Sequence, residues 1–115
     1  MPDALSAAQE RQFESGGRSF RFRRPAVRQV IAADVLAAQY RGGLPVTALT
    51  YGLALSEARA ALNTYCVEPR TVPAAQDGFD FGDLDEDALM ALYTEVSSWL
   101  DSFRARVDSA QGGLG

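Results

Sequence analysis

The chain has 115 residues, a formal net charge of −4 and an apolar fraction of 47%. This length suits one compact domain that buries most of its apolar surface. The negative net charge repels nucleic acids and anionic membranes, so either contact would need a local basic patch.

Histidine is absent and cysteine occurs once, at Cys66. Imidazole-based catalysis and most zinc sites are therefore excluded. Cys66 has no intramolecular disulfide partner, which fits a reducing compartment or indifference to redox state. The start MPDALSAAQE has neither a basic region nor an apolar core, and no stretch has the length of a membrane span. We expect a soluble protein of the cytoplasm.

The first predicted element is a β-hairpin over residues 11–23. Arg18–Arg23 alternates in the manner of a strand, so Phe20 and Phe22 share one face and Arg21 and Arg23 share the other. The preceding Gly-Gly pair suits a tight turn, which would let Arg11–Glu14 pair back on this strand. A hairpin is marginally stable alone, so its phenylalanines should dock on other elements.

Two helices are predicted next, over about 25–40 and 45–66. Pro25 favours the start of the first helix and the glycines after Arg41 favour its end. Its apolar residues recur at spacings of three and four: Val27, Val30, Ile31, Val35 and Ala38.

Within the second predicted helix, Ser56 followed by an acid is typical of a new N-cap. Residues 58–66 are therefore either a separate helix or a continuation after a bend. Pro69 closes the helical pattern, because the residue before a proline is disfavoured in the α conformation.

A third helix is predicted over about 85–108, after an irregular acidic connection, by a long amphipathic pattern. Residues 1–10 and the Gly-rich residues 109–115 should be flexible. The predicted fold class is α+β, mostly α, with an N-terminal β-hairpin packed on three or four helices in a single domain over residues 11–108.

The acidic connection invites a calcium-site interpretation, because Asp83, Asp85 and Asp87 alternate as ligands do in EF-hand loops. Ala88 and Thr94 occupy the positions where that loop requires glycine and a bidentate glutamate. Acids before a helix are more typical of N-caps and first-turn charges. We therefore expect no metal and no cofactor.

Charge is strongly segregated along the chain. Residues 11–28 hold six arginines and one glutamate, whereas residues 77–87 hold six acids and no base. The two stretches could face each other, or each could face a partner. Nucleic-acid binding is disfavoured, because Phe20 and Phe22 lie on the opposite face from Arg21 and Arg23, so these rings would be core rather than a stacking platform.

No residue combination predicts catalysis. Ser56, Tyr65 and Cys66 are the nucleophile types worth naming, and none has a histidine to act as base. Cys66 is more typical of a small apolar packing group, and Trp99 of core or interface. We expect no catalytic residue and no enzyme activity.

The order of these features resembles a known layout. It combines an N-terminal F-x-x-G-G-R-x-F-R-F-R-x-P hairpin, a cysteine and E-P before an acidic D-F-G-D-L loop, and a closing helix L-M-A-L-Y-T-E-V-S-S-W-L-D-S-F-R. Over about residues 10–106 the chain resembles the tail assembly chaperones of long-tailed bacteriophages, with Ala91–Arg104 the most specific part.

The resemblance implies a protein that binds the long tape measure protein in the host cytoplasm, keeps it soluble and helps recruit tail tube subunits. Homo-oligomerisation is compatible with it. Such a holder needs an apolar groove with a polar rim, and the seam between the last and middle helices is the expected place.

The candidate partner-binding residues are named on this basis, with core packing as the open alternative for the apolar ones. They are Leu92, Val96, Trp99 and Phe103 on the last helix, Arg21, Arg23 and Arg24 of the hairpin, and Asp83 and Asp85 of the acidic loop.

Two other classes of protein remain as alternatives. A structural or adaptor protein of the tail or head-tail connector would use the same surfaces to form a lasting ring. A small DNA-binding regulator would use residues 45–66 as a helix-turn-helix, but Arg59 is the only base there, which leaves few phosphate contacts.

Overall fold

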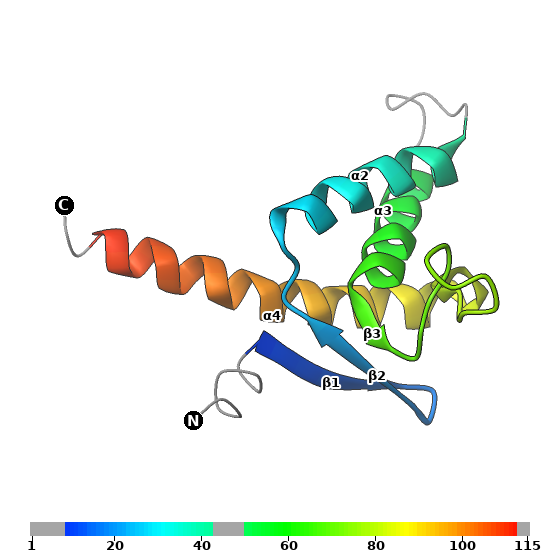
Figure 1. Cartoon of the computed structure of the whole chain (residues 1–115), viewed down its shortest axis with the longest axis horizontal. Helices are drawn as coiled ribbons and strands as arrows, with labels where there is room; N and C mark the ends of the chain where they lie inside the picture. The colour runs from blue at the N-terminus through cyan, green and yellow to red at the C-terminus, as the bar shows by residue number, and fades with distance from the viewer. Residues whose placement is uncertain (1–8, 43–49, 113–115) are drawn as a thin grey trace.

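The computed structural model describes residues 9–42 and 50–112. Its fold is α+β and mostly helical, with the N-terminal hairpin packed on helices as the sequence predicts (Figure 1). The elements in chain order are β1 (Glu10–Ser15), β2 (Arg18–Arg23), α2 (Val27–Arg41), α3 (Thr50–Tyr65), β3 (Cys66–Glu68), the short 3-10 helix η1 (Phe81–Asp83) and α4 (Glu86–Gly112).

The predicted hairpin is confirmed. Strands β1 and β2 are antiparallel, with Phe13 opposite Phe20 and Ser15 opposite Arg18. The turn between them uses Gly16 and Gly17 at φ of 58° and 77°, a region that glycine adopts far more readily than other residues. Strand β1 begins at Glu10, one residue earlier than predicted.

A third strand was not predicted. Residues 66–68 form β3, which pairs antiparallel with β2 and gives a sheet of order β1-β2-β3. The helix predicted over about 45–66 therefore ends one residue earlier than expected, since α3 stops at Tyr65. Three residues are too few to show a strand period, and the pairing with β2 that stabilises them is a tertiary contact.

The start of the predicted helix, residues 45–49, lies outside the described residues. From Thr50 on, α3 is one continuous helix, and the Ser56 hydroxyl donates to the Gly52 carbonyl 2.8 Å away, as it does inside a helix rather than at an N-cap. The continuation is thus correct, and a separate helix from residue 58 is wrong.

The hairpin supplies the aromatic half of the main core. Phe20, Phe22 and Phe81 are fully buried, and the Phe20 and Phe81 ring centroids lie 4.9 Å apart. The other buried members come from β1, α3, β3 and α4: Phe13, Ala58, Leu62, Cys66, Leu89, Leu92 and Val96. The predicted anchoring role of Phe20 and Phe22 is confirmed.

Helix α2 lies outside this core. It packs on α3 through a small second cluster of Leu36, Ala37 and Ala60, with Tyr40 against it. Figure 1 shows α2 at one side of the molecule and the hairpin at the other, with α4 passing between them. Helix α2 ends at Arg41, followed by Gly42 at φ of 62°, as the sequence predicts.

Helix α4 is longer than predicted. It begins at Glu86 and continues to Gly112, past the predicted end near residue 108. Residues 113–115 and 1–8 lie outside the described residues. Within residues 9–42 and 50–112, no helix combines the length and apolar character needed to cross a membrane.

Candidate protein-binding surface

Helix α2 carries an apolar stripe that faces solvent. Val27, Val30, Ile31 and Val35, here called the α2 stripe, are 76%, 43%, 58% and 55% exposed. The repeat that predicts this helix is therefore the face turned away from the domain. The stripe lies opposite the buried face, which is made of Ala33, Leu36 and Ala37.

The physical reason is that α2 has apolar residues on both sides. Small residues fit the close approach of α2 to α3, where Ala60 is fully buried. The larger β-branched side chains are left outside. A helix that is apolar all round is typical of one covered on both sides, and a contiguous exposed apolar patch is typical of an interaction site.

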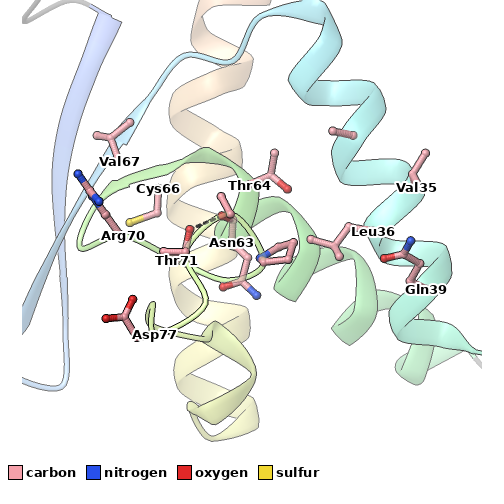
Figure 2. Close-up of a pocket in the computed structure, with 14 residues that line it drawn as sticks. Val35, Leu36, Gln39, Asn63, Thr64, Cys66, Val67, Arg70, Thr71 and Asp77 are labelled. Carbon is pink, nitrogen blue, oxygen red and sulfur yellow. Dashed lines mark hydrogen bonds between the residues drawn. The ribbon is translucent and has the colours of Figure 1, made fainter.

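A groove adjoins the stripe. The α2 groove has a volume of about 990 Å³ and lies between α2 and the segment from Asn63 to Asp77. Val35 belongs to both the stripe and the groove, which makes one continuous apolar surface. Figure 2 shows Leu36 pointing from α2 toward the other wall of the opening.

An ion pair holds the wall of the groove on α3. Arg59 binds Asp80 with two contacts, Nε to Oδ1 at 3.0 Å and Nη2 to Oδ2 at 2.6 Å. Hydrogen bonding to this guanidinium lowers the pKa of Asp80 from 3.8 to about 2, although partial burial opposes the shift. The same guanidinium stacks over the Tyr40 ring, 3.8 Å from its centroid.

Asn63 completes this attachment from a buried position. Its Oδ1 accepts from the Phe81 backbone N–H at 2.9 Å, and its Nδ2 donates to Asp80 and to the Tyr40 hydroxyl. Its backbone carbonyl accepts from the Thr71 hydroxyl (Figure 2). One buried amide thus ties α2, α3 and the loop after β3 together, which fixes both walls of the groove.

A second opening lies on the other side of α2. This acidic cleft has a volume of about 410 Å³ and is lined by residues of α2, α3 and α4. Asp34, Glu57 and Asp101 contribute carboxylates, and Tyr65 and Tyr93 contribute rings. Burial, and secondarily the negative charge of Asp34, raises the pKa of Tyr65 above its usual value.

The predicted partner-binding residues of the last helix are in the core. Leu92 and Val96 are 2% exposed and Phe103 is buried. Trp99 is half-buried and packs edge-on against Phe13 and Phe103, at centroid distances of 5.9 and 5.4 Å. The core-packing alternative therefore holds for Leu92, Val96 and Phe103, and Trp99 is partly buried against the core. The seam between the last and middle helices contains the acidic cleft, whose lining includes Val96.

The hairpin arginines are exposed but pair within the sheet. Arg21 contacts Glu10 at 3.2 Å and Glu68 at 3.1 Å, and Arg23 contacts Glu10 at 3.0 Å. The Arg24 guanidinium lies 4.6 Å from the centroid of a ring on α4. For Arg21 and Arg23 the idea that residues 77–87 supply the counter-charge is wrong, because their acids lie on β1 and β3. Arg18 does line an opening together with Asp83 and Asp85.

The two acids singled out in the loop have different positions. Asp85 is the N-cap of α4, since its Oδ1 accepts from the Ala88 N–H at 2.8 Å, which confirms the capping prediction. Asp83 is exposed on η1. Among the described residues, no group of three or more His, Cys, Asp or Glu side chains is arranged to hold a metal ion.

Cys66 is a buried packing group in the structure. Burial is the main cause that raises the pKa of its thiol from 9.0 to about 11, and its Sγ donates to the carbonyl oxygens of Glu68 and Pro69 at 3.4 Å. A thiol with a raised pKa is a poor nucleophile at neutral pH.

Sequence reasoning missed the surface on α2. The signal was available, because large apolar side chains and small ones both recur along this helix and cannot all face one way. The acidic cleft had no such signal, since Asp34, Glu57 and Asp101 come from three separate helices.

Comparisons of the chain with known protein families, with curated proteins and with solved structures find no match.

Proposed function

We propose that the protein is a tail assembly chaperone that binds the tape measure protein of a long-tailed phage in the host cytoplasm. The observation that carries the proposal is the exposed α2 stripe, which offers apolar area to a partner without unfolding the domain. The layout of the chain, which resembles this class, supplies the choice of partner.

The chemistry of the partner fits the stripe. A tape measure protein exposes apolar helical faces before the tail is built around it, and an apolar helix face recognises another by packing side chains at i, i+3 and i+4. The α2 stripe has that spacing, and the α2 groove beside Val35 adds room for a larger side chain.

The size of the stripe favours reversible binding. Full burial of a valine or isoleucine side chain contributes about 1.5–3 kcal/mol, so the exposed parts of four such residues offer on the order of 4–6 kcal/mol. Association costs at least about 4 kcal/mol in lost freedom of motion. A surface of this strength holds a partner transiently, as a chaperone requires, and releases it when tail tube subunits arrive.

The test is co-expression with the very long, helix-rich protein that the proposal expects a neighbouring gene to encode as the tape measure protein. We expect the soluble fraction of the tape measure protein to rise with the wild-type chain and to fall back with Ile31→Asp. Ser98→Asp is the matched control, because it places the same charge at an exposed position of α4. The Ser98→Asp variant should raise the soluble fraction of the tape measure protein as much as the wild-type chain does.

Failure of the wild-type chain to raise that solubility would overturn the proposal. Closed rings of the chain that copurify with finished particles would replace it with the structural or adaptor role.

A further inference from the structure

We propose that the α2 stripe and the acidic cleft together bind one amphipathic helix whose apolar face is bordered on one side by lysine or arginine. The inference deepens the proposed function and rests on it for the identity of the partner, but the binding chemistry comes from this surface alone.

The stripe and the cleft are contiguous at Asp34. This residue lines the cleft and follows Ile31 by three positions and Val30 by four. Residues at those spacings are neighbours on a helix surface. A helix packed on the stripe therefore has one border directly above the cleft.

The cleft selects positive charge. Asp34 and Glu57 are exposed acids of this cleft, and no arginine is among the described residues that line it. The rings of Tyr65 and Tyr93 add faces over which a cation can lie. The carboxylates are not gathered as metal ligands are, so the cleft suits long basic side chains that reach in from a bound helix.

The opposite border of the α2 stripe carries positive charge. Arg28 precedes Ile31 by three positions and is exposed, and Arg70 lines the α2 groove, whose lining also includes Asp77. The charge thus changes across the stripe, from acidic on the side of α4 to basic near Arg28. This difference fixes how a bound helix is rotated about its own axis, because only one of its borders can face the cleft.

A second copy of the chain is a poorer occupant. Each copy has a net charge of −4 and brings its own acidic cleft beside its own stripe. Like charges at close range oppose association, whereas a basic-bordered helix is attracted. We therefore commit to a basic amphipathic helix.

The experiment uses two synthetic helical peptides with the same leucine stripe and the same glutamine border on one side. One peptide has lysine on the other border and the second has glutamate. Binding to the full chain is measured by fluorescence anisotropy of labelled peptide. We expect the lysine peptide to bind at least about 10-fold more tightly than the glutamate peptide at low salt. The ratio of the two affinities should decrease in about 0.5 M salt, because salt screens exposed charges.

Variants assign the preference to the cleft. The pair Asp34→Asn with Glu57→Gln should lower the ratio to below about 3-fold, as expected when two of the facing charges are removed. Glu95→Gln, at an exposed position of α4 away from the cleft lining, should leave the ratio unchanged. Ile31→Ser should weaken both peptides alike.

Three results would overturn the inference: equal affinity for the two peptides, a lysine preference that survives loss of Asp34 and Glu57, or a dimer of the chain that Ile31→Ser dissociates. A lysine preference without rescue of the tape measure protein would instead refute the proposed function and leave this inference standing. Rescue of the tape measure protein without a preference for the lysine peptide would refute this inference and leave the proposed function standing.

Discussion

Arg59 and Asp80 form a two-contact ion pair, 21 residues apart in the chain, that attaches the loop after β3 to α3. Their side chains are 34% and 22% exposed, so the pair is partly shielded from water. Asp80 also accepts from the Gly82 N–H at 2.8 Å, which begins η1 and places Phe81 in the core. The acid therefore has a structural role.

The first prediction concerns Asp80→Asn. We expect the free energy of unfolding at pH 7 to fall by about 1–3 kcal/mol, because charged hydrogen bonds are lost and Arg59 loses its partner. Urea unfolding followed by circular dichroism measures it. Asp77→Asn, an exposed acid in the same loop, should change it by less than about 0.5 kcal/mol.

The same pair predicts a pH dependence. The pKa of Asp80 is lowered from 3.8 to about 2 in the folded protein. Its stabilisation is therefore complete above the unfolded pKa and is lost as pH falls through about 2. The difference in the free energy of unfolding between the wild type and Asp80→Asn should therefore decrease as the pH falls from 3.8 to about 2. A constant difference down to the folded pKa would contradict the ion-pair explanation.

The α2 stripe and the buried face of α2 should respond oppositely to truncation. Ile31→Ser should change the free energy of unfolding by less than about 0.5 kcal/mol, because its side chain is already largely in water. Leu36→Ala should cost about 2–4 kcal/mol, because Leu36 is 7% exposed. Chemical denaturation measures both, and a large loss for Ile31→Ser would mean that the stripe is buried in the free protein.

The reactivity of Cys66 tests the packing of β3. A thiol pKa raised from 9.0 to about 11 lowers the thiolate fraction at pH 8 by about 100-fold. Modification by a thiol reagent should be at least that much slower in the native protein than in the urea-unfolded chain, which is the control. Equal rates would show that β3 opens readily from β2.

A substitution at Gly78 tests how closely the backbone is packed in the loop that forms one wall of the α2 groove. An added Cβ would lie 2.7 Å from the Thr71 carbonyl carbon and 2.9 Å from the Arg70 carbonyl oxygen, so the backbone must move. We expect Gly78→Ala to cost about 1–3 kcal/mol, as overpacking does. Thermal unfolding measures the loss, and Gln76→Ala, exposed in the same loop, is the control. An unchanged midpoint for Gly78→Ala would contradict this close approach.

Much of the fold could be predicted from local signals. The alternation of phenylalanine and arginine in β2, with Gly16 and Gly17 before it, specifies the hairpin because side chains alternate across a strand and the turn needs positive φ. The 3.6-residue period specifies α2 and α4, and Asp85 begins α4 by capping it. These elements depend on residues close together in the chain.

Other features depend on contacts between distant residues. Strand β3 exists because Cys66 and Glu68 meet β2, and the groove exists because Asn63, Arg59 and Asp80 converge. No short window contains those pairs, so periodicity could not predict them.

The sequence by itself determined the hairpin of β1 and β2 and the helices α2, α3 and α4, and that Phe20 and Phe22 must be covered. Only the tertiary structure decided which apolar face remains free. Leu92 and Val96 pack with the hairpin phenylalanines in the core. Ile31 and Val35 remain exposed because α3 packs on the face of α2 that has small side chains. A helix that is apolar on two sides has two candidate buried faces, and the choice between them depends on the shape of its neighbour.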